Sequence, residues 1–321
     1  MTELNILVST EARDYIGHAL PATADGRPCR LITPDSAPEA LLDIDVALIS
    51  RDVTGSSTKF VVSDSLEGFY QTLRSAPRLK WVHTHSAGLD RPIFPELKAR
   101  GIVVTPSSGA NAAIVAHTAL AGMLSLARRL PYFMRAQSRH EWSPLIEADL
   151  PKDLKGQTAV IVGWGPIGRY LAQLLKVVGL DIIVVRHSGE AAPEARATVS
   201  YEDIHSVLPQ ADWLVLACPL TDSTSQMIDA KAFSLMPPGA QLVNVARGEV
   251  VIEQDLIAAL RAHTLSGAFL DVFQHEPLSS DSPLWAMENV IATPHSAGHS
   301  QGNYGRVIDI FLDKLRNWHS T

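Results

Sequence analysis

The sequence predicts an α/β fold in which two doubly wound parallel-sheet domains share one chain. Three observations support this prediction. Short apolar runs such as Leu4–Val8 and Ala159–Val162 are typical of buried parallel strands. Helical patterns separate these runs within the N-terminal part of the chain and again after Thr158. The length of 321 residues is long for one core and comfortable for two.

Composition and charge are those of an ordinary folded chain, with 46% apolar and 19% charged residues. The net charge of −7 argues against a nucleic-acid partner. The two cysteines, Cys29 and Cys218, cannot form a disulfide framework, so we expect a reducing cytoplasm. The N-terminus lacks the features of a signal peptide. The uncharged stretch 101–127 contains Pro106 and His117, which favours a buried helix over a membrane span.

The first series of elements lies in the N-terminal part of the chain. The expected strands are Leu4–Val8, Asp45–Ser50, Trp81–His85 and Ile102–Thr105. An apolar helix over 112–127 follows, with Asn111 as its N-cap and Pro131 ending it. The polar residues 136–156 predict a loop-rich connector.

The second series begins at Thr158. The expected strands are Ala159–Val162, Asp181–Val185, Trp213–Ala217, Leu242–Val245, Ala268–Val272 and Val290–Ala292. An amphipathic helix follows the first of them, and Gly179 is suited to its C-terminal cap. The stretch 303–318 predicts a final helix.

A glycine loop separates the first strand of this series from its helix. Gly163 permits a tight turn, Gly165 lets the backbone approach a pyrophosphate, and Gly168 allows close helix–strand packing. Pro166 and Ile167 begin the helix, whose N-terminus directs free N–H groups at phosphates. We expect the bulky Trp164 to face away from those phosphates. The loop therefore predicts a dinucleotide site, the alternative being a glycine-rich turn without a ligand.

The residues after the second strand of this series indicate which dinucleotide binds. NAD sites usually carry a carboxylate here for the ribose 2′-hydroxyl. This chain instead has Arg186, His187 and Ser188. A guanidinium suits a 2′-phosphate, so we expect NADP(H) to be preferred, with NAD(H) possible. The alternative is a surface arginine that contacts no ligand.

Three polar residues follow apolar runs in the last quarter of the chain: Arg247, Glu276 and His295. Ligands of open α/β sheets bind outside the carboxyl ends of the strands. A fixed cation, a carboxylate and an imidazole at that edge suit proton transfer to an anionic substrate. Taken singly, each residue can also be a salt-bridge partner or part of a solvated turn.

Sequence blocks around these residues resemble the signatures of the D-isomer-specific 2-hydroxyacid dehydrogenases, closest in pattern to the glyoxylate/hydroxypyruvate reductase branch. The blocks are 244–248, 270–273, 276–278 and 293–298, together with 219–221 and 283–285. The likeness extends from about residue 80 to residue 298.

The resemblance implies a role for each site residue. His295 is expected to be the general acid or base, with Glu276 bonded to its other ring nitrogen, and Arg247 is expected to bind the substrate carboxylate. Asp271 is expected to hold the nicotinamide carboxamide, and Pro219 and Ala246 to contact the cofactor. The turn Ser86, Ala87 and Gly88 is expected to bind the substrate carboxylate through backbone N–H groups, and its alternative is an ordinary turn.

The resemblance also implies a domain plan. A flavodoxin-like substrate domain is expected over 1–104 plus 296–321, and a Rossmann cofactor domain over 105–295. The active site is expected in the cleft between them, and two chains are expected to form a homodimer through the cofactor domain. No metal is expected, because His83 and His85 share a strand face without further clustered ligands.

The expected activity is NADP(H)-dependent reduction of a small 2-oxo acid, glyoxylate or hydroxypyruvate, by an NAD(P)-dependent D-2-hydroxyacid dehydrogenase. Two alternatives remain open. One is a dinucleotide-sensing, co-repressor-like binding protein of the same fold. The other is a short phosphoglycerate dehydrogenase.

Overall fold

A computed structural model describes residues 3–58, 60–146 and 150–319, and it divides the chain into two compact units. Unit 1 contains the chain up to Asn111 and again from Ser300, and unit 2 contains Ala112–His299. Segment 105–111, predicted in the cofactor domain, therefore lies in unit 1. Segment 296–299, predicted in the substrate domain, lies in unit 2. At the second boundary the physical reason is clear, because the N–H group of Ala297 bonds to the carboxylate of Asp271 in unit 2.

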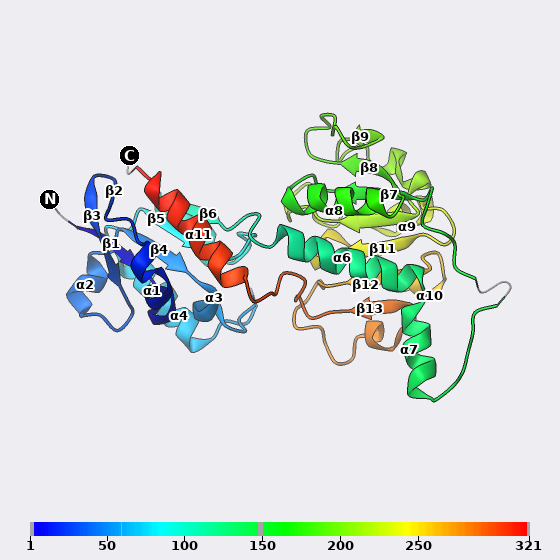
Figure 1. Ribbon diagram of the computed structural model, residues 1–321, viewed down its shortest axis with the longest axis horizontal. Helices are drawn as coiled ribbons and strands as arrows, with labels where there is room; N and C mark the ends of the chain where they lie inside the picture. The colour runs from blue at the N-terminus through cyan, green and yellow to red at the C-terminus, as the bar shows by residue number, and fades with distance from the viewer. Residues whose placement is uncertain (1–2, 59, 147–149, 320–321) are drawn as a thin grey trace. The chain divides into compact units, whose positions relative to one another are not determined.

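The sheet of unit 1 has the strand order β2-β3-β1-β4-β5-β6 (Figure 1). Its strands are β1 (Leu4–Leu7), β2 (Thr23–Ala24), β3 (Arg27–Ile32), β4 (Val46–Ile49), β5 (Trp81–Thr84) and β6 (Val103–Pro106). Neighbouring strands are parallel, apart from the antiparallel pair β2 and β3. Sequence analysis missed these two strands, because β2 is two residues long and β3 contains two arginines and a proline.

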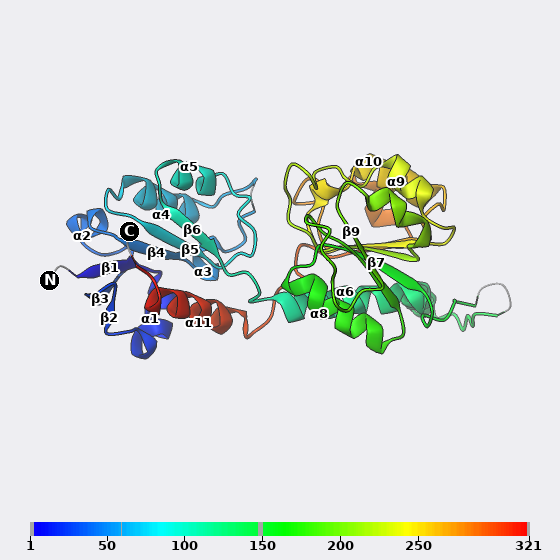
Figure 2. The same cartoon turned by 90° about the horizontal axis from the view of Figure 1, so that it is seen from above.

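Helices cover both faces of this sheet, with α4 and α5 on one face and α1 and α11 on the other (Figure 2). The helices of unit 1 are α1 (Thr10–Ile16), α2 (Pro38–Leu42), α3 (Arg51–Thr54), α4 (Asp64–Ser75), α5 (Ile93–Ala99) and α11 (Asn303–Arg316). The C-terminal helix α11 returns to unit 1, where Phe311 stacks on Trp81 at 5.4 Å between ring centroids. This apolar contact explains why the end of the chain belongs to the first unit.

The sheet of unit 2 is parallel throughout, with the strand order β13-β12-β11-β10-β7-β8-β9. Its strands are β7 (Thr158–Val162), β8 (Asp181–Val185), β9 (Ala197–Val199), β10 (Trp213–Leu216), β11 (Gln241–Asn244), β12 (Gly267–Leu270) and β13 (Val290–Ala292). The direction of strand addition reverses between β7 and β10. Ligands of such sheets bind at this switch point.

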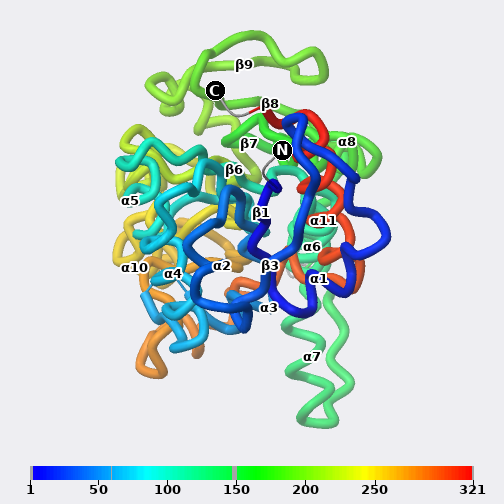
Figure 3. The backbone as a smooth tube through the Cα atoms, turned by 90° about the vertical axis from the view of Figure 1, so that its left-hand side faces the viewer, coloured from blue at the N-terminus to red at the C-terminus, as the bar shows by residue number. Residues whose placement is uncertain are grey.

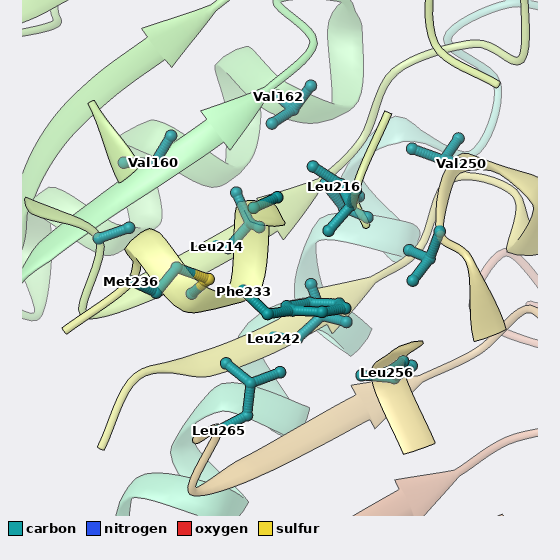
Figure 4. Packing of buried hydrophobic residues seen from close by; sticks show 14 of the residues in the cluster. Val160, Val162, Leu214, Leu216, Phe233, Met236, Leu242, Val250, Leu256 and Leu265 are labelled. Carbon is teal, nitrogen blue, oxygen red and sulfur yellow. The ribbon is translucent and has the colours of Figure 1, made fainter. Parts of the chain in front are cut away.

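Helices α6 (Ala112–Ala127) and α8 (Pro166–Val177) pack on one face of this sheet, and α9 (Ala230–Leu235) and α10 (Glu253–Arg261) pack on the other. Figure 4 shows the second face, where Phe233 and Leu256 meet Leu214 and Leu242 of the strands. Short 3₁₀ turns occur at Gly17–Ala19, Ile204–Ser206, Leu208–Gln210, Gly248–Val250 and Pro283–Ala286. The two apolar cores hold the strand ends of unit 2 in fixed positions.

Helix α7 (Leu130–Ser138) corrects one expectation, because Pro131 lies in its first turn rather than only ending α6. Proline lacks an N–H group, so the first turn of a helix tolerates it. Arg129 separates the two helices with a left-handed φ of 54°. Helix α7 extends away from the sheet of its unit (Figure 3). Within the described ranges, no helix combines the length and apolar character needed to cross a membrane.

Candidate active site

Arg247 follows β11 in a loop whose backbone is fixed by Asn244. The Asn244 amide accepts from Ala246 N at 3.0 Å and donates to Arg247 O at 3.1 Å. Nη1 of Arg247 in turn donates to Ala246 O at 2.7 Å. The next residue must be glycine, because a Cβ on Gly248 would lie 1.9 Å from the carbonyl carbon of Phe273. This close approach brings the Arg247 loop against the segment that leads to Glu276.

Glu276 lies just beyond β12, and its side chain is 14% exposed. Its Oε1 accepts from Phe273 N at 3.1 Å, so the carboxylate folds back on its own loop. The loop is anchored a second time, because Gln274 N donates to Glu253 Oε2 at 3.1 Å. Sequence analysis missed Glu253, since only the tertiary fold brings α10 to this loop.

His295 lies in a loop that wraps around the buried carboxylate of Asp271, which is 2% exposed. Asp271 Oδ1 accepts from Thr293 Oγ1 at 2.6 Å and from Ser296 N at 2.8 Å. Ala297 N bonds to both oxygens, at 3.1 and 3.0 Å. His295 has a left-handed φ of 49°, and its N–H group donates to Asp271 O at 2.8 Å. These bonds hold a backbone conformation that a non-glycine residue rarely adopts.

The two loops bring Glu276 and His295 together. His295 Nδ1 lies 2.7 Å from Glu276 Oε2, and the histidine side chain is 48% exposed. Burial by itself raises the pKa of Glu276, but the hydrogen bond and charge of His295 lower it. The bond from Phe273 N and the charge of Arg247 also lower this pKa, so the net shift is downward. Glu276 therefore stays ionised and directs Nδ1–H towards itself, which leaves Nε2 for proton exchange.

A cavity of about 310 Å³ lies at the switch point of unit 2. It is lined by six predicted residues, namely Gly163, Gly165, Arg186, His187, Ser188 and Pro219, and by Trp164, Tyr201 and Ala217. Trp164, which we expected to face away from the phosphates, packs partly against the core and also lines this cavity. The predicted cofactor residues Pro166, Ile167, Gly168, Ala246 and Asp271 are not part of its lining.

The glycine loop beside this cavity has the geometry of a pyrophosphate site. A Cβ on Gly163, whose φ is 104°, would lie 2.6 Å from Ala217 O, and one on Gly168 would lie 2.1 Å from Gly163 O. A Cβ on Gly165 would meet no atom within 4 Å. Gly165 therefore presents bare backbone to open space at the start of α8, where the helix N-terminus attracts anions. The residues present fit a dinucleotide cofactor.

The end of the cavity that is lined by Arg186 lies beside β9. Arg186 N donates to Val199 O at 3.0 Å, and its Nη2 lies 3.6 Å from Glu190 Oε2. Glu190 N donates to Ser188 Oγ at 3.4 Å, which folds the acidic residue back over the arginine. Burial raises the pKa of the nearby Tyr201 to about 12, so its phenol remains a hydrogen-bond donor at neutral pH.

The predicted substrate turn, Ser86, Ala87 and Gly88, follows β5 in unit 1. Ser86 Oγ donates to Gly88 O at 2.8 Å, and Ser107 N donates to Ser86 O at 3.0 Å. Both bonds fix the turn while Ala87 stays exposed. The structure thus brings Arg247, Glu276 and His295 together in unit 2 and places this turn in unit 1.

Helix α6 carries His117 and Thr118 side by side. His117 is exposed on α6 and makes an edge contact with Tyr170, with the ring centroids 5.6 Å apart. Its neighbour Thr118 donates to Ala297 O at 3.1 Å and so links α6 to the His295 loop. No cluster of three metal-ligating side chains occurs among the residues described.

The chain is similar to known proteins in sequence and in fold. The model of the D-isomer specific 2-hydroxyacid dehydrogenase, NAD binding domain, matches residues 120–297. The chain is 37% identical to glyoxylate/hydroxypyruvate reductase B of Shigella boydii, over 76% of this chain and 77% of the relative. It is also 37% identical to glyoxylate reductase of Thermococcus litoralis, over 71% of each chain.

A similar solved structure is the NADPH-dependent glyoxylate/hydroxypyruvate reductase of Sinorhizobium meliloti in complex with NADP and malonate. The TM-score is 0.74 at 26% identity, over 100% of this chain and 95% of that one. Fold and site together define a two-unit α/β oxidoreductase with a dinucleotide loop. The chain belongs to the D-isomer specific 2-hydroxyacid dehydrogenase family, and it is an NAD(P)-dependent dehydrogenase.

Proposed function

We propose that the protein uses NADPH to reduce a small 2-oxo acid, glyoxylate or hydroxypyruvate, to the 2-hydroxy acid. The observation that carries the proposal is the hydrogen bond of 2.7 Å between His295 Nδ1 and Glu276 Oε2. The positive charge of Arg247 also lowers the pKa of Glu276. An acid–base group beside a fixed cation is what reduction of an anionic ketone or aldehyde requires. The names of two similar proteins, a glyoxylate reductase and a glyoxylate/hydroxypyruvate reductase, support the choice of substrate.

A nicotinamide cofactor held in unit 2 would supply the hydride for C2 of the substrate. His295 Nε2–H donates the proton to the 2-oxo oxygen, which becomes the new hydroxyl. Glu276 stabilises the imidazolium before transfer and fixes the ring through Nδ1. Arg247 binds the substrate carboxylate and polarises the 2-oxo group, since a guanidinium cannot lose its proton. The N–H groups of Ala87 and Gly88, beside Ser86 in unit 1, are proposed as a further site for a substrate carboxylate.

The proposed cofactor contacts lie in unit 2, and six of them line its cavity. Gly163, Gly165 and Gly168 shape the pyrophosphate site, Pro166 and Ile167 begin the helix behind it, and Pro219 and Ala246 complete the contacts. Arg186, His187 and Ser188 bind the 2′-phosphate, which makes NADP(H) preferred and NAD(H) possible. Asp271 Oδ2 accepts from Ala297 N at 3.0 Å. A carboxylate oxygen accepts two bonds, so the nicotinamide carboxamide can be the second donor.

A matrix of substrates and cofactors tests the proposal. The purified chain is assayed for loss of NADPH or NADH absorbance with glyoxylate, hydroxypyruvate, phosphohydroxypyruvate and larger 2-oxo acids. We expect the highest kcat/KM for glyoxylate or hydroxypyruvate with NADPH. A preference for phosphohydroxypyruvate would identify a short phosphoglycerate dehydrogenase. Tight cofactor binding without turnover of any acid would favour the dinucleotide sensor.

We also propose a homodimer in which α7 packs against a second copy of the chain. Its Leu130, Phe133 and Met134 are 44%, 37% and 68% exposed, and Trp142 beyond the helix is 97% exposed. Exposed apolar side chains at helical spacing mark an association surface. Light scattering should give twice the 34.8 kDa chain mass. Met134→Glu should lower that mass, whereas Leu42→Glu, at an exposed apolar residue of unit 1, should not.

A reducing cytoplasm remains our proposed compartment, and the two free cysteines support it: Cys29 is half-buried and Cys218 is buried.

A further inference from the structure

His83 is a buried histidine in the sheet of unit 1, 0% exposed, with a hydroxyl partner on each ring nitrogen. Nδ1 lies 2.8 Å from Thr105 Oγ1, and Nε2 lies 2.9 Å from Ser107 Oγ. Both partners belong to β6 or follow it, and β6 is the strand that pairs with the strand of His83, β5 (Figure 1). No step of the proposed reaction uses this histidine.

The hydrogens of this group can be assigned from its partners. The Trp81 indole only donates, and its Nε1 donates to Thr105 Oγ1 at 2.8 Å. The Thr105 hydroxyl hydrogen is then available to His83 Nδ1. On the other side, Ser107 Oγ donates to Thr84 O at 2.9 Å. Ser107 must therefore accept from His83, so the histidine carries its hydrogen on Nε2.

Ser107 connects this histidine to the Ser86–Gly88 turn. Ser107 N donates to Thr84 O and to Ser86 O, both at 3.0 Å. Ser86 N donates to Thr84 Oγ1 at 3.4 Å, and Ser86 Oγ donates to Gly88 O at 2.8 Å. A continuous chain of hydrogen bonds thus runs from the ring of His83 to the turn.

Burial lowers the pKa of His83 to about 3, and the charges of Lys314 and His85 act in the same direction. The ring is therefore neutral at physiological pH, and its Nε2–H is a permanent donor to Ser107. A group that keeps one hydrogen-bonding pattern over the working pH range is suited to fixing a backbone segment.

We propose that His83 is a positioning residue: its Nε2–H orients Ser107, which aims the N–H groups of Ala87 and Gly88 at the substrate carboxylate. This inference rests on the proposed function, because it takes the Ser86–Gly88 turn to be the carboxylate site. It predicts that a defect at His83 appears in the KM of the 2-oxo acid rather than in cofactor binding or in proton transfer.

A matched pair of variants tests the proposal. In His83→Gln the amide nitrogen reaches the place of Nε2 and keeps the bond to Ser107. In His83→Asn the shorter amide reaches only the place of Nδ1, so Ser107 loses its donor. We expect the KM of the 2-oxo acid to rise about tenfold in the Asn variant and less than about twofold in the Gln variant, the size expected for one lost hydrogen bond. The kcat and the Kd for NADPH should stay at the wild-type values in both.

A second pair covers the case in which substitution of His83 prevents folding. Ser107→Ala removes the hydroxyl that accepts from His83 Nε2 and keeps the backbone bond to Ser86 O. Thr105→Val removes the partner that Nδ1 shares with the Trp81 indole and leaves Ser107 bonded to Nε2. We expect a raised KM from the first and an unchanged KM from the second. Equal KM values within either folded pair would show that His83 only fills space. If the wild-type chain reduces no 2-oxo acid, both the proposed function and the positioning role of His83 are contradicted. If the wild type is active but the variants of each pair have equal KM values, only the positioning role of His83 is contradicted.

Discussion

Nδ1 of His295 lies 2.7 Å from Oε2 of Glu276, and the two residues come from loops that follow different strands. The second carboxylate oxygen of Glu276 accepts from Phe273 N at 3.1 Å. Both oxygens are therefore engaged, and the carboxylate has one orientation towards the imidazole. In the proposed reaction Nε2 is therefore the nitrogen that exchanges a proton with substrate, and each site variant below has an expected defect.

Replacing Glu276 by Gln should lower kcat by about 10- to 100-fold, because a neutral amide still accepts from Nδ1–H but does not stabilise the imidazolium. The Kd for NADPH should stay unchanged. Steady-state kinetics and fluorescence titration measure the two quantities. Glu202→Gln, at an exposed carboxylate of the same unit, is the matched control. A wild-type kcat in the Glu276 variant would remove this residue from the reaction.

Arg247→Lys should raise the KM of the 2-oxo acid and lower kcat, with a combined loss of about 10- to 100-fold in kcat/KM. A lysine keeps the positive charge but loses the planar pair of donors that fits a carboxylate. Kinetics at saturating NADPH separate the two parameters. If both parameters stay at wild-type values, the substrate carboxylate is bound elsewhere.

The cation beside the cofactor cavity should set the choice of dinucleotide. Arg186→Asp should shift the ratio of kcat/KM values from NADPH towards NADH, because a carboxylate repels a 2′-phosphate and accepts from a 2′-hydroxyl. Glu190→Gln should move the ratio in the opposite direction by about two- to threefold, since the 3.6 Å ion pair that it releases is solvent-exposed and weak. An unaltered ratio in the Arg186 variant would show that the phosphate binds elsewhere.

His83 should make the chain sensitive to acid. Its pKa is about 3 when folded, against 6.5 for an ordinary histidine, so below pH 6.5 the unfolded chain binds a proton that the folded chain does not. The stability from this group is complete above pH 6.5 and falls by about 1.4 kcal/mol for each pH unit below it, until the folded pKa is reached. Urea unfolding of the wild type and of His83→Gln at several pH values measures the difference. A difference that does not vary with pH would show that His83 has the same pKa in the folded and the unfolded chain.

Much of this architecture could be predicted from the sequence, because apolar runs and the glycine loop report on local structure. Helix α6 has the predicted bounds, and β8 and β13 do as well. The sequence did not reveal β2, β3 and β9, since short or half-exposed strands lack a continuous apolar run. The sequence predicts Pro131 only as the end of the apolar helix and not as part of α7, because proline suits the start of a helix as well as the residues beyond its end.

The supporting residues of the site could not be predicted in the same way. Arg247, Glu276 and His295 each follow an apolar run, so the strand ends mark them. Glu253 and Thr118 act only through contacts between segments distant in sequence, which no local pattern reports. Asn244 acts within its own loop, where its amide bonds to Ala246 N and Arg247 O. Asp271 is predicted to hold the nicotinamide carboxamide, and in the structure its carboxylate binds the backbone of the His295 loop.

The central claim is that His295 transfers the proton, and His295→Ala tests it most directly. We expect NADPH oxidation with glyoxylate or hydroxypyruvate to fall by about 100-fold or more, while the Kd for NADPH stays at the wild-type value. His299→Ala, which removes another exposed histidine of unit 2, should change turnover little. Wild-type turnover in the His295 variant, with the cofactor bound normally, would contradict the account.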